Sequence, residues 1–111
     1  MRVLFLCSRN RLRSPTAEEI FRTRRGWEVV SAGLAPDAEE LLSPETLDWA
    51  DIVFVMERSH RQKLRQNFGA YLKNKRIVCL DIPDTYDFMQ SELVTLLFHK
   101  VNAILPVHEN D

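Results

Sequence analysis

The sequence predicts an α/β fold with a parallel β-sheet, and two observations carry this prediction. Short apolar runs typical of strands buried on both faces recur along the chain. These runs are residues 3–6, 27–30, 52–56 and 77–80. A segment with helical signals follows each run, and these segments are residues 14–25, 43–50, 59–68 and 91–104. Strands that alternate with helices are joined by right-handed crossovers, which produce a parallel sheet.

The first helix is expected soon after the first strand. Ser14 can cap this helix, Pro15 suits the first helical position, and two glutamates are expected in the first turn. Gly26 ends the helix, and the second strand follows at once. Residues 31–42, which contain a glycine and a proline, are expected to form a loop.

The second half of the chain continues the alternation. Ser43 is expected to cap a short helix that ends at residue 49 or 50. Residues 52–56 are apolar throughout and form the clearest strand prediction. Ser59 is expected to cap a basic helix, and residues 91–104 repeat apolar side chains at helical spacing.

Length and composition predict one globular domain spanning residues 1–111. Of the 111 residues, 45% are hydrophobic and 28% are charged, which is unlike a disordered chain. The apolar stretches are far shorter than the roughly 18 residues of a membrane span, and the first ten residues lack a signal-peptide core. Two cysteines, Cys7 and Cys79, cannot form the disulfide framework of a secreted protein, so we expect a cytoplasmic protein.

The net charge of −1 conceals segregated charge. The net charge is +5 over residues 1–25, −8 over 26–57, +7 over 58–76 and −5 over 77–111. The 58–76 block has few interleaved aromatic residues and is interpreted as a solvated helix face, so neither a nucleic-acid nor a membrane partner is expected. The first basic block is a candidate anion site.

The segment from Cys7 to Ser14 has the layout of a phosphate-binding loop. A cysteine is followed by five residues, an arginine and a serine, between a predicted strand and a predicted helix. A loop that wraps before a helix turns backbone N–H groups inward, and the helix dipole adds positive potential. The same field favours the thiolate form of Cys7. Arg13 can hold two phosphoryl oxygens through its planar fork, which a lysine cannot do.

With these features the sequence resembles the low-molecular-weight protein tyrosine phosphatase family. The matching positions are residues 3–7, Asn10, 13–15, 17 and 18, Phe21, 31–33, 55–60 and 81–86. The resemblance spans nearly the whole chain and implies a three-layer αβα fold with a four-stranded parallel sheet in the order 2-1-3-4. Residues 34–48 stand in for a longer helical segment of the family, so the chain resembles a compact variant.

The resemblance implies a cysteine-dependent phosphatase that works through a phosphocysteine intermediate. Cys7 would be the nucleophile, while Arg13 and the backbone amides of residues 8–13 would stabilise the phosphoryl oxygens. Ser14 would hydrogen-bond the thiolate and help it to leave. The expected substrates are phosphomonoesters, first of all protein phosphotyrosine, with phosphoarginine and small phosphoesters left open.

A second strand exit supplies the general acid in this resemblance. Asp84 takes the acid position and Thr85 replaces the family's proline, while Asp81 and Asp87 remain alternative acids. Tyr86 keeps the family's aromatic position and is a candidate to stack on an aromatic leaving group.

The loop itself supplies the remaining candidate substrate-binding residues, with two departures from the family. These residues are Ser8, Arg9, Asn10, Arg11 and Leu12. Asn10 is expected to brace the loop. Arg9 stands where the family usually has glycine, and an arginine adopts a left-handed backbone only at a cost. Leu12 replaces a frequent second cysteine, so a protective disulfide is absent.

No metal and no cofactor are expected, because His60, His99 and His108 lack ligand spacing and are interpreted as surface residues. The expected partners are a phosphorylated protein, a small aryl phosphate or a phosphate-like oxyanion, and the oligomeric state is left open.

Two other functions remain as alternatives. An arsenate reductase would need further cysteines, whereas Cys79 lies on a predicted strand and is expected in the core. A non-catalytic phosphate-binding or phosphoprotein-binding module is suggested by Arg9, Arg11 and the shortened middle of the chain.

Overall fold

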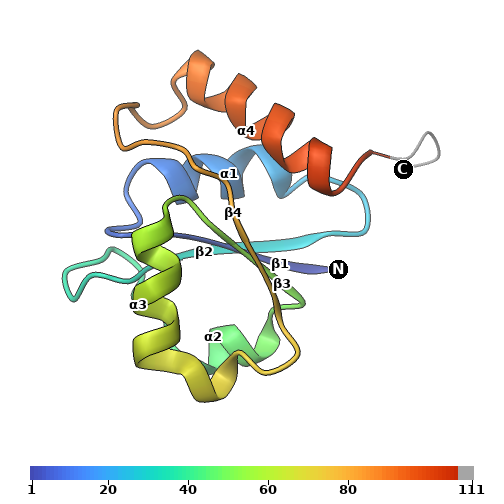
Figure 1. Cartoon of the computed structure of the whole chain (residues 1–111). Helices are drawn as coiled ribbons and strands as arrows, with labels where there is room; N and C mark the ends of the chain where they lie inside the picture. The colour runs from blue at the N-terminus through green and yellow to red at the C-terminus, as the bar shows by residue number, and fades with distance from the viewer. Residues whose placement is uncertain (108–111) are drawn as a thin grey trace.

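A computed structural model describes residues 1–107 as a parallel sheet with helices on both faces (Figure 1). The strands are β1 (Arg2–Cys7), β2 (Glu28–Gly33), β3 (Ile52–Val55) and β4 (Arg76–Cys79). The helices are α1 (Arg13–Phe21), α2 (Pro44–Trp49), α3 (Arg58–Phe68) and α4 (Ser91–Ile104), with a 3-10 turn, η1 (Gly69–Tyr71). The strand order is β2-β1-β3-β4, which confirms the predicted order. Within residues 1–107 no helix is long and apolar enough to cross a membrane.

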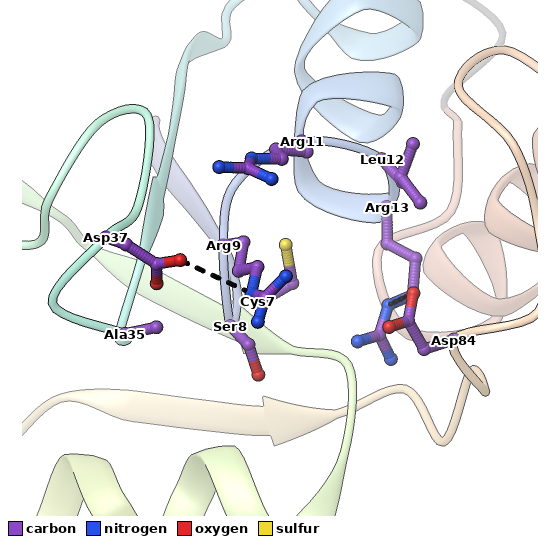
Figure 2. A pocket seen from close by; sticks show the side chains of 9 residues that line it. All are labelled: Cys7, Ser8, Arg9, Arg11, Leu12, Arg13, Ala35, Asp37 and Asp84. Atoms are coloured by element: carbon purple, nitrogen blue, oxygen red, sulfur yellow. Dashed lines mark ion pairs between the residues drawn. The ribbon is translucent and has the colours of Figure 1, made fainter.

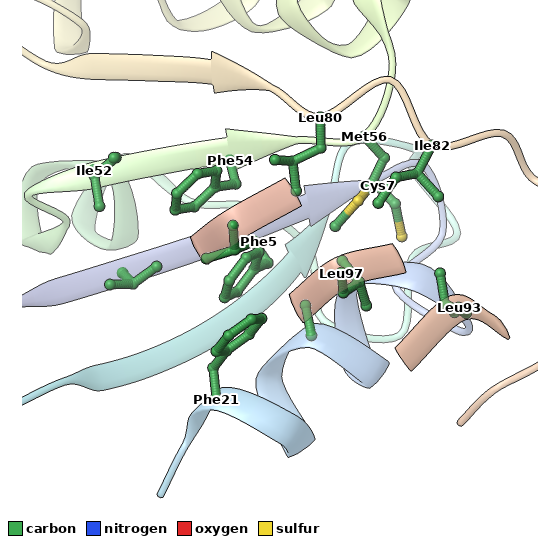
Figure 3. Close-up of a cluster of buried hydrophobic side chains, with 13 residues drawn as sticks. Phe5, Cys7, Phe21, Ile52, Phe54, Met56, Leu80, Ile82, Leu93 and Leu97 are labelled. Atoms are coloured by element: carbon green, nitrogen blue, oxygen red, sulfur yellow. The ribbon is translucent and has the colours of Figure 1, made fainter. Parts of the chain in front are cut away.

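Helices α1 and α4 cover one face of the sheet, and α2 and α3 cover the other (Figure 1). Side chains alternate along a strand, so Phe5 and Cys7 of β1 face α1 and α4, while Leu4 and Leu6 face α2 and α3. Phe5 stacks between two aromatic rings, with ring-centre distances of 5.6 Å to Phe21 and 5.2 Å to Phe54 (Figure 3). The same cluster continues along β1 to Cys7, which therefore sits on a rigid, packed strand end.

Two predicted helix caps are wrong. Helix α1 begins at Arg13 with Leu12 at its N-cap and no side-chain cap, because the hydroxyl of Ser14 contacts Cys7 instead. Starting at Arg13, the helix also has no acid in its first turn, and it ends at Phe21. Helix α3 is capped by Glu57 rather than by Ser59.

Other elements follow the prediction more closely. Ser43 caps α2 by accepting a hydrogen bond from the N–H of Thr46 at 3.2 Å, and α4 has the predicted bounds. Residues 31–33, predicted as loop, extend β2 because they pair in register with the end of β1. The chain then turns beside the loop that follows β1.

Candidate active site

The loop from Cys7 to Arg13 is shaped from outside by residues 34–39. Three N–H groups of residues 34, 35 and 39 donate to the carbonyl groups of residues 7, 8 and 9, at distances of 2.7–3.0 Å. In one peptide unit the carbonyl and the N–H point in opposite directions. With the carbonyls turned outward, the next N–H groups point into the loop, and this arrangement binds anions.

Gly33 permits this close approach. A Cβ atom at position 33 would lie 2.5 Å from the Cβ of Ala38 and 2.7 Å from the carbonyl oxygen of Ser8. Any larger residue would push the 34–39 segment away from the loop. Residues 34–39 therefore support the loop from outside.

Asn10 braces the loop from within. Its φ of 57° is left-handed, a conformation that asparagine tolerates better than most residues. The amide nitrogen Nδ2 donates to Ser14 Oγ and to Ser31 Oγ, both at 2.9 Å, and Ser31 in turn donates to Glu18 at 2.7 Å. The left-handed position is thus Asn10 and not Arg9, so the expected strain at Arg9 does not arise. The side chain of Asn10 is buried away from the pocket.

Cys7 lies at the carboxyl end of β1 with only 4% of its surface exposed. Its sulfur is 2.9 Å from Ser14 Oγ. Asn10 donates to that hydroxyl, and a Cys7 thiolate has no hydrogen to give, so in the thiolate form the hydroxyl of Ser14 donates to the sulfur. This hydrogen bond stabilises negative charge on the sulfur.

Arg13 is 2% exposed and is held in one orientation (Figure 2). Its Nη1 donates to Glu57 Oε2 and to the carbonyl of Ile82, each at 2.7 Å. Its Nε lies 3.6 Å from Asp84 Oδ1. Among the described residues Nη2 contacts no acceptor, and the 3.6 Å from Nε to Asp84 is beyond hydrogen-bond distance, so Nη2 and Nε can both donate to an oxyanion beside Cys7.

Of the three candidate acids, Asp84 lines the pocket that contains Cys7 and Arg13. Asp81 points to another surface, where its carboxylate lies 4.0 Å from Arg58 and accepts a hydrogen bond from Cys79. Asp87 lies outside the pocket, in the turn before α4.

The pocket is an open cavity of about 640 Å³, within the usual size of small-ligand sites. Its lining residues are Cys7, Ser8, Arg9, Arg11, Leu12, Arg13, Ala35, Asp37 and Asp84 (Figure 2). At the rim Arg9 pairs with Asp37 at 3.6 Å, and Arg11 pairs with Glu39 at 3.2 Å. Acids from the 34–39 segment therefore offset much of the positive charge that the sequence places in this loop.

Tyr86 is not part of this pocket, contrary to the expectation of a stacking residue. It is half-buried against the core beneath α4 and lines a separate depression with residues of that helix. The loop leading to α4 turns its ring inward. Over residues 1–107, the pocket around Cys7 has no aromatic residue in its lining.

His60 is the main correction to the predicted site. It was expected at the surface, yet it is 2% exposed. Its Nδ1 accepts a hydrogen bond from the N–H of Glu57, and its Nε2 contacts Ser8 Oγ, both at 3.1 Å. Burial and the positive charge of Arg13 are the chief causes that lower the pKa of His60 from 6.5 to about 4, so the ring is neutral near pH 7.

His99 does not line the pocket around Cys7. His99 is exposed on α4, and His108 lies outside the described residues. Across the described part of the chain, no group of three or more His, Cys, Asp or Glu side chains is arranged to hold a metal ion.

Cys79, expected in the core, is only partly buried on the edge strand β4. It packs against the cluster on the α2 and α3 face, and its sulfur donates to Asp81 at 3.3 Å. Burial raises the pKa of the Cys79 thiol, which makes it a weaker nucleophile near neutral pH.

The sequence analysis assigned no supporting role to Glu57, His60, Ser31 or Asp37, although the first three lie in segments that match the resembled family. A signal existed for Glu57, because it follows the buried strand β3 at the same sheet edge as Cys7. No local pattern marked Asp37, which reaches the pocket only through the turn after Gly33.

Comparison with known proteins supports the fold. No protein-family model and no curated protein matches this chain. Among solved structures, the low molecular weight protein tyrosine phosphatase SP-PTP from Streptococcus pyogenes has a TM-score of 0.78 and 13% identity, covering 98% of this chain and 95% of that one. The tyrosine phosphatase Wzb from Escherichia coli K30, in complex with phosphate, has a TM-score of 0.74 and 18% identity, covering 93% and 94%.

The YwlE arginine phosphatase from Geobacillus stearothermophilus is also similar, with a TM-score of 0.70 and 23% identity over 94% of this chain and 92% of that one. The chain thus has the fold of the low-molecular-weight protein tyrosine phosphatases. This confirms the fold that the sequence resemblance implied.

Proposed function

We propose that this chain is a cysteine-dependent phosphatase that forms a phosphocysteine intermediate. The observation that carries the proposal is the contact of Cys7 Sγ with Ser14 Oγ at 2.9 Å, in a loop whose amides face inward beside the fixed guanidinium of Arg13. Structurally similar proteins named as tyrosine and arginine phosphatases support it.

In the first step the Cys7 thiolate attacks phosphorus, forming an S–P bond as the bond from phosphorus to the leaving oxygen breaks. Arg13 and the loop amides stabilise the equatorial oxygens. Asp84, 3.6 Å from Arg13 Nε, donates its proton to the leaving oxygen.

In the second step water attacks phosphorus and gives a proton to the Asp84 carboxylate. The S–P bond breaks, inorganic phosphate forms, and the Cys7 thiolate is restored. The hydroxyl of Ser14 donates to the departing sulfur, which lowers the energy of the developing thiolate.

Protein phosphotyrosine is the first substrate candidate, as in the resembled family. Phosphoarginine is a second candidate, because the pocket has no aromatic wall among the described residues and presents Asp37 and Asp84 at its rim. A cationic guanidinium leaving group would lie favourably beside these carboxylates. The two candidates are distinguished by measuring kcat/KM for matched phosphotyrosine and phosphoarginine peptides. The measurement is made on the wild type and on Asp37→Asn, which is the discriminating variant.

The proposed function is tested by assaying wild type and Cys7→Ser on p-nitrophenyl phosphate at mildly acidic pH. We expect turnover in the wild type, a trapped phosphocysteine on Cys7 by mass spectrometry after acid quench, and no turnover in Cys7→Ser. Full activity in Cys7→Ser would contradict the mechanism. Phosphate binding by a folded wild type without turnover of any of these substrates would indicate the non-catalytic module instead.

A further inference from the structure

The N-terminus of α3 contacts both ends of the phosphate loop. The carboxylate of Glu57 bonds Arg13, the last residue of the loop, at 2.7 Å. Three residues later, the ring of His60 contacts Ser8, the first residue after the nucleophile, at 3.1 Å. The first turn of α3 therefore contacts both ends of the loop.

The hydrogen bonds of His60 can be assigned from geometry. The N–H of Glu57 can only donate, so the Nδ1 that receives it carries no hydrogen. A neutral ring must then carry its hydrogen on Nε2, and this N–H donates to Ser8 Oγ. The ring orientation is fixed at one nitrogen by the capping bond and at the other by the loop.

Four charged groups act on the protonation of His60. Arg13 of α1 and Lys63 of α3 oppose a positive ring, while Glu57 and Asp84 favour it, and burial is the largest effect. The balance holds the pKa of His60 at about 4, so the neutral ring persists through the pH range in which phosphatase assays are run.

We propose that His60 is a positioning residue of the phosphate loop, which it holds closed by donating from Nε2 to Ser8. This role rests on the proposed function, because the bound phosphoryl group is what the closed loop receives. Ser8 is already held at its carbonyl by residue 35, so the side-chain bond removes the remaining freedom of the first loop residue. A loop that is already ordered before binding loses less conformational entropy when the oxyanion binds, so its affinity for the oxyanion is higher.

The test is a double-mutant cycle in the affinity for inorganic phosphate, measured by calorimetry at 15 °C on the full chain. His60→Ala and Ser8→Ala are each expected to weaken phosphate binding about three- to tenfold, the effect of one hydrogen bond. The double variant should lose no more than His60→Ala alone, because the bond that Ser8→Ala removes is already absent in His60→Ala. Unchanged affinity in the single variants, or multiplied losses in the double variant, would overturn the proposal.

Conservative variants separate positioning from folding. His60→Gln offers an acceptor and a donor on one side chain, and Ser8→Thr keeps the hydroxyl, so both should bind phosphate nearly as wild type does. Gln62→Ala, an exposed substitution on the same helix, is the matched control and should change nothing. If His60→Ala does not fold, Ser8→Ala against Ser8→Thr carries the test, and equal affinities of these two would refute the proposal.

A pH series tests the assignment of a neutral His60 ring, whose pKa lies at about 4. The ratio of phosphate affinities of wild type and Ser8→Ala should stay constant from pH 5.5 to 8, since phosphate titrates equally in both. A bend in this ratio near pH 6.5 would show a titrating ring and contradict the assignment. Lack of turnover would refute the proposed function yet leave this binding cycle readable, so the two failures are distinguishable.

Discussion

Asn10 supports the phosphate loop through both its backbone and its side chain. Its backbone adopts the left-handed turn at φ 57°, and its amide ties Ser14 to Ser31 across the buried base of the loop. Arg9 does not adopt a left-handed backbone, and its side chain pairs with Asp37 at 3.6 Å.

At the residue scale, Asp84→Asn should lower kcat on phenyl phosphate by about 10²-fold. The loss should be smaller on p-nitrophenyl phosphate, because its better leaving group needs less help from a proton. Steady-state kinetics of both substrates checks this. Asp81→Asn and Asp87→Asn are the matched controls and should retain wild-type rates, since neither carboxylate reaches the pocket. A loss confined to Asp81→Asn would move the acid there.

A second residue-scale prediction concerns Gly33. Gly33→Ala should destabilise the protein by about 1–3 kcal/mol, since its Cβ would meet Ala38 at 2.5 Å and the backbone of Ser8 at 2.7 Å. It should also weaken phosphate binding by displacing the segment that shapes the loop. Gly69→Ala is the control, because a Cβ there meets nothing within 4 Å, and it should be neutral or slightly stabilising. Urea unfolding and calorimetry measure the two effects.

Among the elements, α3 connects fold and site most directly. Its first turn supplies the capping pair of Glu57 and His60, and both side chains reach across to the phosphate loop. The remainder of the helix is basic and exposed, while Leu64 anchors it to the sheet. The helix therefore has a solvated face, as its sequence predicts. The burial of His60 in its first turn was not predicted from the sequence.

At this scale we predict a pH-dependent stability. The folded state holds His60 neutral with a pKa of about 4, whereas an unfolded chain binds a proton near pH 6.5. The stabilisation is therefore complete above about pH 6.5 and is lost progressively as the pH falls toward 4. Urea unfolding should show wild type losing about 1–2 kcal/mol more than His60→Gln between pH 7.5 and 5. Equal losses in the two proteins would contradict the assignment.

For the whole molecule, the central strands β1 and β3 connect two cores. Leu97 of α4 packs on one face of the sheet and Leu64 of α3 on the other, and both are fully buried. The two cores pack on opposite faces of the same strands, so we expect them to unfold together. The site lies at the edge where both layers and the strand ends meet.

We therefore expect Leu64→Ala and Leu97→Ala each to lower the free energy of unfolding by about 2–5 kcal/mol in a single transition. Circular dichroism and tryptophan fluorescence during urea unfolding should give coincident curves for both variants. His99→Ala, on the exposed side of α4, is the control and should be nearly neutral. Separate transitions for the two probes would show that the layers unfold independently.

The sequence by itself determined the strand runs, the helix periods and the order of Cys7, Arg13 and Ser14 between a strand and a helix. These are local or periodic signals, and burial of an apolar face enforces them wherever they occur. It also placed Asp81, Asp84 and Asp87 after a second strand at the same sheet edge, and the lining of the pocket then favours Asp84 among them.

Only the tertiary structure decided which side chains surround that loop. Ser14 contacts Cys7 instead of capping α1. Tyr86 packs against the core instead of lining the pocket, and His60, expected at the surface, is buried and contacts Ser8. Asp37 lines the pocket because Gly33 allows the backbone after β2 to pack closely against the backbone of the phosphate loop. Such contacts join residues distant in sequence, and their partners are fixed by packing and by the need to satisfy buried polar groups, which no local pattern records.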